Sequence, residues 1–153
     1  MGAAFFYHLT ERPLEATLPV LLGKALDAGW RVEVRGRDAD QLDRLDRQLW
    51  TGDGFLPHGL AGGPHDADQP VLLTAGKGGN DANCVMSVGG ADIAVDEMQA
   101  LARVCILFDG GDEGAVETAR NQWRDLTEKG AEAQYWAEDG GRWVKKAESG
   151  SNS

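Results

Sequence analysis

The residues best suited to chemistry in this sequence lie on one predicted helix, Asp112–Lys129. At about 100° per residue, Val116 and Trp123 fall together at the margin of its apolar face. Arg120 and Arg124 lie just beyond them, one turn apart. A guanidinium group is suited to carboxylates, and an aromatic ring is suited to anchoring an apolar side chain. This pattern predicts a pocket for an apolar side chain that belongs to an acidic peptide.

A structural interpretation of the same helix stays open. Its narrow apolar arc must face a sheet, and Trp123 at the margin of that arc can belong to the core. The two arginines can then pair with acidic residues at helical spacing, which are Glu113, Glu117 and Glu128. Spacing alone favours this interpretation slightly over a binding site.

A second group of large apolar side chains lies in and beside residues 51–68, a long segment rich in Gly, Pro and Asp. Its most prominent members are Trp50, Phe55 and Leu56. A loop of this composition lies at the surface and is often functional. Its apolar side chains either fold back as a satellite core or form an exposed patch for a protein partner. Composition favours neither alternative.

Phosphate-binding loops are absent from the sequence where an α/β fold would carry them. Residues 76–79 read Gly-Lys-Gly-Gly. A P-loop instead requires Gly-Lys followed by Ser or Thr and then a helix. The first predicted strand is followed by Thr-Glu-Arg-Pro at residues 10–13, not by the glycine-rich turn of a dinucleotide site. We therefore expect no nucleotide cofactor.

Metal binding and nucleophilic catalysis have no support in the sequence either. The long loop holds four potential metal ligands at spacings that match no established site, which are His58, His65, Asp66 and Asp68. Cys84 and Cys105 each lie in an apolar stretch, which indicates two buried, reduced thiols. We expect no catalytic residue and no metal site, and hence no enzyme.

The elements that position these residues belong to a chain of 153 residues with 15 basic and 25 acidic side chains, a formal net charge of −10. This length predicts one domain with its own core. The negative net charge disfavours a protein that binds the phosphates of nucleic acid over its whole surface. The sequence has no apolar run of membrane-spanning length and no secretory signal, so we expect a cytoplasmic protein.

Strand and helix patterns alternate along the chain. Strands are predicted at residues 5–9, 30–34, 71–74, 82–88, 103–108 and 133–137, and helices at 13–28, from 38 past 49, at 92–102 and at 112–129. Such alternation favours parallel pairing through right-handed crossovers. The predicted fold class is α/β, a three-layer Rossmann-like domain with a mainly parallel sheet and helices on both faces. We expect this single domain to cover residues 1–147, with residues 148–153 as a disordered tail.

Several motifs of the sequence resemble, in their order and spacing, the chi subunit family of bacterial DNA polymerase III holoenzyme. They are FFYHL near the start, LD--LW followed by FLPHGLAGG, QPVLLT, and RVCILFDG-DE-AVE-AR-QWR. The most specific is FLPHGLAG, and the helix motif AR-QWR is the second. The resemblance covers residues 4–146.

The resemblance implies a non-catalytic accessory subunit of the clamp-loader assembly that contacts DNA only indirectly. Two partners are implied: the acidic, Phe-ended carboxyl-terminal tail of single-stranded DNA-binding protein, and the small psi subunit or another clamp-loader component. Matched motif by motif, the tail site falls on Val116, Arg120, Trp123 and Arg124, and the psi-facing surface on Trp50, Phe55 and Leu56. The family more often has Tyr and Lys where this chain has Trp123 and Arg124, so an aromatic ring and a cation are kept.

Two other functions fit an α/β architecture. A protein-interaction domain of similar fold, serving a DNA repair assembly, would use the same surfaces. A nucleotide-dependent enzyme would need a glycine-rich turn after the first strand, and residues 10–13 do not supply one.

Overall fold

A computed structural model describes residues 3–51, 57–76 and 79–149 of the chain. Its strands are β1 (Ala3–Leu9), β2 (Val32–Arg35), β3 (Gly59–Leu60), β4 (Val71–Thr74), β5 (Cys84–Ser87), β6 (Arg103–Asp109), β7 (Ala133–Asp139) and β8 (Arg142–Ser149). Its helices are α1 (Leu14–Asp27), α2 (Ala39–Thr51), α3 (Val95–Met98) and α4 (Glu113–Glu128), with a 3-10 turn at Asp66–Asp68.

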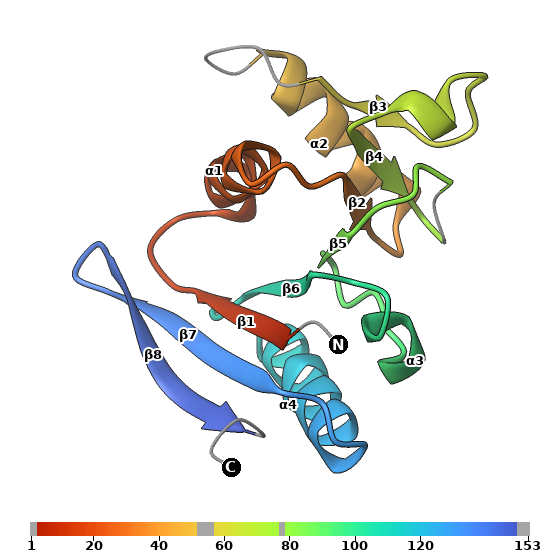
Figure 1. The fold of residues 1–153 in the computed structure, drawn as a ribbon. Helices are drawn as coiled ribbons and strands as arrows, with labels where there is room; N and C mark the ends of the chain where they lie inside the picture. The colour runs from red at the N-terminus through yellow and green to blue at the C-terminus, as the bar shows by residue number, and fades with distance from the viewer. Residues whose placement is uncertain (1–2, 52–56, 77–78, 150–153) are drawn as a thin grey trace.

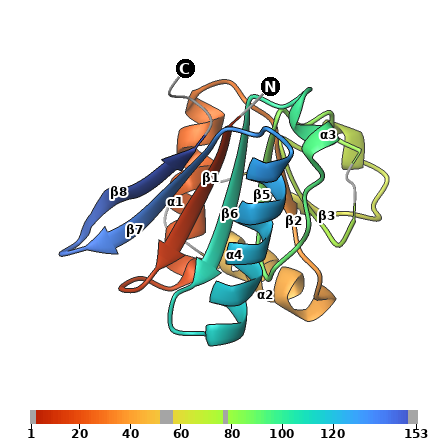
Figure 2. The same cartoon turned by 90° about the horizontal axis from the view of Figure 1, so that it is seen from below.

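The strands form one eight-stranded sheet in the order β3-β4-β2-β5-β6-β1-β7-β8 (Figure 1). All neighbours pair in parallel except β7 and β8, which are antiparallel. Helices α1 and α2 lie on one face of the sheet, and α3 and α4 lie on the other (Figure 2). The predicted α/β class with a mainly parallel sheet is therefore confirmed, while the finer description as a three-layer, Rossmann-like domain stays a prediction.

Alternation along β1 divides the core into two layers. Successive residues of a strand point to opposite faces. Tyr7 and Leu9 therefore pack toward α1 and α2, whereas Phe6 packs toward α4 with Ala119 and Leu126. The two faces of one strand thus hold the helix pairs on opposite sides of the sheet. No helix among the described residues is long and apolar enough to cross a membrane.

Two predicted segments differ from the structure. Residues 51–68, expected to be irregular throughout, contain the short edge strand β3 and a 3-10 turn. The helix expected over residues 92–102 is reduced to the four residues of α3. Its first turn is closed by the side chain of Glu97, which accepts a hydrogen bond from the Ala94 backbone N–H (3.1 Å). Glu97 also accepts hydrogen bonds from the buried Arg35. The conformation of this segment is therefore determined more by tertiary contacts than by its weak helical periodicity.

Strand β8 is a larger correction, because residues 142–146 were predicted only as a basic segment after the last strand. Gly140 and Gly141 have φ values of +62° and +80° and join β7 to β8 in a tight turn. Two consecutive residues with positive φ are typical of a hairpin turn, and glycine adopts them without steric cost. β8 includes Glu148 and Ser149, which the prediction assigned to the tail. Residues 150–153 lie outside the described residues.

Candidate functional site

Helix α4 presents the candidate peptide-binding residues, and local sequence signals fix both of its ends. The Asp112 side chain accepts a hydrogen bond from the Ala115 backbone N–H (3.2 Å), which caps the amino-terminal end. At the other end Gly130 adopts a φ of +90°, and the Ala131 N–H returns to the Leu126 carbonyl oxygen (3.0 Å). The helix lies on β6 and β7 through its buried Ala119 and Leu126. The outer, exposed face of α4 is therefore held in a fixed position relative to the sheet.

Trp123 stands at the margin of this packed face. Its ring meets Phe6 edge to face at 5.3 Å between centroids and Tyr135 at 6.2 Å. Val116, two turns earlier, is also partly buried against the same core layer. Both side chains are thus held in place by the sheet while part of their surface stays accessible, as an apolar anchor site requires.

Arg120 and Arg124 are exposed on the same helix. Within the described part of the chain, no ion pair joins either arginine to Glu113 or Glu117, or to any other carboxylate. The ion pair of this helix is Lys129 to Asp125 (3.3 Å), one turn further along. The alternative prediction, that glutamates on α4 neutralise the arginines, is therefore not observed. Two guanidinium groups remain available beside Trp123.

An aromatic strip continues the site from α4 over β7 to the carboxyl ends of β1 and β6, and sequence reasoning missed it. The Nδ1 atom of His8 lies 2.6 Å from the Tyr135 hydroxyl. The His8 ring also packs on Phe108, 5.1 Å between centroids. Tyr135 also contacts Trp123, so the strip runs without a break from His8 to the margin of α4. The cluster was hidden because its members come from three strands distant in sequence.

His8 is a neutral member of this strip near pH 7. Burial lowers its pKa below the usual 6.5, and the nearby charge of Arg120 lowers it further. A backbone hydrogen bond with Gly110 and the charge of Asp109 oppose this shift. Burial likewise raises the pKa of Tyr135. The positive charge of the site therefore comes from the arginines and not from His8.

Gly110 shapes the strip by letting the backbone approach His8. A Cβ atom at this position would collide with the His8 ring and would lie 2.9 Å from the Leu9 carbonyl oxygen. Only glycine fits here, and it follows directly after β6. The Asp-Gly-Gly sequence at the end of the strand is the signal from which this close approach could have been expected.

Trp50, the described member of the second predicted surface, lies at the end of α2 on the opposite face of the sheet (Figure 2). Its side chain is 54% exposed, so it does not belong to a satellite core. The ring packs on His58 at 4.2 Å, and the buried His58 Nε2 contacts the Asp46 carbonyl oxygen (3.1 Å) and Oδ1 (3.2 Å). Phe55 and Leu56 lie outside the described residues. Trp50 and the candidate residues of α4 are therefore on opposite faces of the sheet.

Comparison with known families decides the identity. A family model described as "DNA polymerase III chi subunit, HolC" matches residues 1–134. The chain belongs to the DNA polymerase III chi subunit family. All predicted partner-binding residues fall inside the matched range. A search of curated protein sequences found no match.

Membership of the chi family makes this chain a non-catalytic accessory subunit of DNA polymerase III. The family match therefore supports the predicted role in DNA replication.

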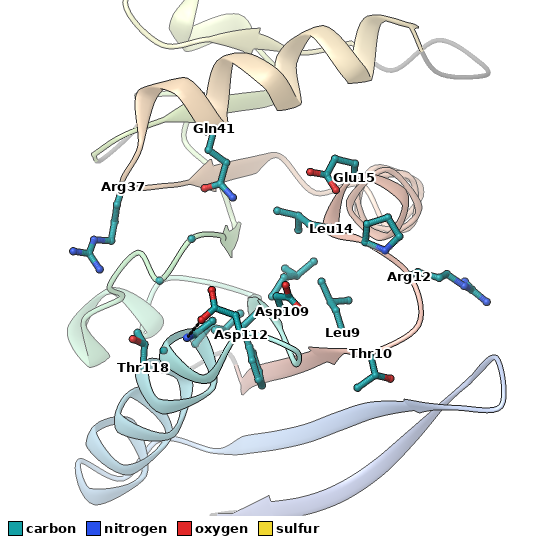
Figure 3. A pocket seen from close by; sticks show the side chains of 18 of the residues that line it. Leu9, Thr10, Arg12, Leu14, Glu15, Arg37, Gln41, Asp109, Asp112 and Thr118 are labelled. Atoms are coloured by element: carbon teal, nitrogen blue, oxygen red, sulfur yellow. Dashed lines mark hydrogen bonds between the residues drawn. The ribbon is translucent and has the colours of Figure 1, made fainter.

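A crevice of about 870 Å³ lies at the carboxyl edge of the sheet in this chi-family chain, where many α/β proteins bind nucleotides. Figure 3 shows Leu14 and Glu15 of α1 facing Asp109 and Asp112 across it. Beside it, the backbone N–H groups of residues 10–12 all point at one oxygen, Oε1 of the buried Glu138, at 3.1, 3.3 and 3.3 Å. The backbone donors that could bind a phosphate therefore bind a carboxylate of the protein itself.

The next residues to place are the histidines and cysteines that could have bound a metal ion or acted as nucleophiles, which are His58, His65, Cys84 and Cys105. His58 is buried, and His65 is exposed, 3.9 Å from Asp68. No group of three potential metal ligands occurs within residues 3–51, 57–76 and 79–149. Cys84 and Cys105 are both buried and free, as predicted. A hydrogen bond between these thiols and their burial raise the pKa of Cys105.

Proposed function

We propose that this chi-family chain binds the acidic carboxyl-terminal tail of single-stranded DNA-binding protein on α4 and links it to the clamp-loader assembly of DNA polymerase III. The observation that carries the proposal is the pair of exposed arginines beside Trp123, with no ion pair to a described residue. In a protein with a net charge of −10, two such cations on one helix face form a local site for a negatively charged partner.

The chemistry of the tail complements this face. An apolar terminal side chain can pack on the accessible surfaces of Trp123 and Val116, which the sheet holds in place. The terminal carboxylate and the aspartates of the tail can accept bidentate hydrogen bonds from Arg120 and Arg124. The rigid helix keeps the apolar and the charged contacts at a fixed separation, which favours one orientation of the peptide.

DNA contact in this proposal is indirect and goes through the partner. The acidic chain repels the phosphate backbone over most of its surface. We also propose that the protein acts in the cytoplasm, together with the DNA polymerase III replicase. The domain is proposed to be a Rossmann-like fold without a working nucleotide site, and the carboxylate of Glu138 at the loop of residues 10–12 supports this.

The proposal is tested with full-length single-stranded DNA-binding protein and a version that lacks its acidic tail. We expect the chi-family chain to bind the full-length protein, to bind it more weakly as salt is raised, and to lose binding to the tail-deleted version. Calorimetric titration with the two proteins measures this difference. Equal binding of both versions would show that the tail is not the ligand.

We also propose that Trp50, together with Phe55 and Leu56, forms the contact with psi or another clamp-loader component. The support is the 54% exposed Trp50 ring on the face opposite α4, which leaves the tail site clear when both partners bind. A large aromatic side chain that is half exposed is typical of an interface anchor.

Trp50→Ala should weaken capture of the clamp-loader partner at least tenfold, because an aromatic anchor contributes about 2 kcal/mol or more to an interface. Its unfolding free energy should fall by less than about 1 kcal/mol, since an exposed ring leaves no core cavity. Co-purification with the clamp-loader complex and urea unfolding measure the two effects. Tail-peptide affinity serves as the control and should not change. Intact capture by a folded variant would remove Trp50 from the interface.

A further inference from the structure

A second cavity, of about 420 Å³, lies between α1 and the strands β1, β5, β6, β7 and β8. It is on the face of the sheet opposite α4, so it is separate from the proposed tail site (Figure 2). Neither Trp50 nor any residue of α2 lines it. Its volume falls in the range of small-molecule sites, about 300–1,000 Å³.

The walls of this α1 cavity are aromatic. They are formed by Phe5, Tyr7, Trp30, Trp136 and Trp143. Tyr7 and Trp143 meet edge to face at 5.2 Å between ring centroids. The indole N–H of Trp136 already donates to the Gln134 side chain (3.0 Å), which leaves its ring as an apolar surface. An occupant must therefore have an apolar body.

The charged side chains that line the α1 cavity are all basic. Arg12, Lys24 and Arg103 line it, and no described carboxylate does. In a chain with 25 acidic and 15 basic residues, three cations without an acidic neighbour in the lining are a marked local reversal of charge. An anionic group on the occupant would complement it.

Arg103 is placed to bind such an anion. Its guanidinium group lies over the Phe5 ring at 4.2 Å and over the Trp30 ring at 5.2 Å. A cation–π contact does not use the N–H donors of the guanidinium group in hydrogen bonds. No hydrogen bond or ion pair joins the Arg103 or Lys24 side chain to another residue in the described part of the chain. Arg12, by contrast, is engaged with Glu138 (3.8 Å) and the Gly141 carbonyl oxygen (3.3 Å).

The Tyr7 hydroxyl adds an unpartnered polar group to the lining. The Tyr7 side chain is only 9% exposed, and its hydroxyl has no hydrogen-bond partner among the residues that the structure describes. Burial raises the pKa of Tyr7, so the hydroxyl keeps its proton and can donate it in a hydrogen bond.

We propose that the α1 cavity binds a small carboxylate with an apolar body, an acyl chain or an aromatic ring, whose carboxylate is held by Arg103. The aromatic walls receive the body, and the edge donors of Arg103 receive the two carboxylate oxygens. Lys24 and the Tyr7 hydroxyl supply further positive charge and a further donor. The site does not depend on the function proposed for α4.

The test uses the full chain and four probes, each kept below any micelle-forming concentration. Decanoate supplies the acyl carboxylate and naphthalene-2-acetate the aromatic one, while decanol and decyltrimethylammonium are the neutral and cationic controls. Calorimetry measures affinity, and the indole N–H signals of Trp30 and Trp143 report the place of binding. We expect a carboxylate to bind at least tenfold more tightly than both controls and to shift these signals. The tighter of the two carboxylates identifies the body of the ligand.

Two variants test whether the carboxylate of the ligand binds beside Arg103. Arg103→Gln should lower carboxylate affinity about tenfold or more, the usual cost of losing hydrogen bonds to a charged group. Val20→Glu, at a half-exposed residue of the cavity rim, adds a repelling carboxylate without touching the core and should weaken decanoate but not decanol. Arg44→Gln, on the exposed face of α2, is the matched control and should have no effect. Decanol binding as tightly as decanoate, failure of both carboxylates to bind, or unchanged affinity in both site variants would overturn the proposal.

Discussion

The double variant Arg120→Ala/Arg124→Ala should bind an acidic tail peptide about 30- to 150-fold more weakly than the wild type. Each arginine supplies hydrogen bonds to charged groups, worth about 1–1.5 kcal/mol apiece at an exposed, screened site. Neither arginine is in an ion pair with a described residue, so the peptide does not have to displace an internal carboxylate. Folding should be unaffected, because both side chains lie on the exposed face of α4.

Fluorescence anisotropy with a labelled peptide measures the loss, and a charge-matched double variant controls for it. Arg44→Ala/Arg142→Ala removes the same two positive charges from exposed positions outside α4 and should change affinity less than about threefold. If both double variants bound the peptide equally weakly, the loss of affinity would come from the change in net charge and not from contacts on α4. Undiminished binding by Arg120→Ala/Arg124→Ala would exclude α4 as the tail site.

Arg35→Met should destabilise the fold by about 3–5 kcal/mol, because it removes the buried guanidinium group that binds two acidic side chains. The buried Arg35 donates to Glu33 (2.7 Å) and to both carboxylate oxygens of Glu97 (2.7 and 3.0 Å). Burial acts to lower the pKa of Arg35, but the hydrogen bonds with Glu97 and Glu33 outweigh it and raise the pKa above its ordinary value. This network ties β2 to the short helix α3.

Urea unfolding followed by circular dichroism measures the destabilisation. Arg37→Met, two residues along the chain at an exposed position, is the matched control and should change stability by less than about 0.5 kcal/mol. A triple variant that also carries Glu33→Gln and Glu97→Gln should recover part of the loss, since it also removes the two negative charges that Arg35 binds. Wild-type stability of Arg35→Met would show that the network contributes little.

Local patterns in the sequence were sufficient for the strongest elements. The run Val71–Thr74 was predicted with the bounds that β4 has, because a short apolar segment between turn residues indicates a buried strand. α4 was predicted within one residue of its observed ends, since Asp112 and Gly130 mark them and the apolar repeat is regular. The candidate arginines were found for the same reason.

Features that depend on strand order could not be read from local patterns. His8 and Tyr135 are 127 residues apart, and they meet only because β1 pairs with both β6 and β7. β8 was missed because its charged residues Lys145, Lys146 and Glu148 do not alternate regularly with apolar residues. The Gly140-Gly141 pair was the one local signal for that hairpin.

The position of the tail peptide on the protein is the most direct test of the proposed function. Isotope-labelled protein is titrated with an acidic peptide that ends in Phe with a free carboxylate, and the side-chain N–H signals of tryptophan and arginine are followed. We predict that the signals of Trp123, Arg120 and Arg124 shift with peptide concentration while those of Trp50 and Trp143 do not, and that a peptide without its terminal Phe causes no shift at the same concentrations. Shifts at Trp50 or Trp143 with the signals of α4 unchanged would contradict the account.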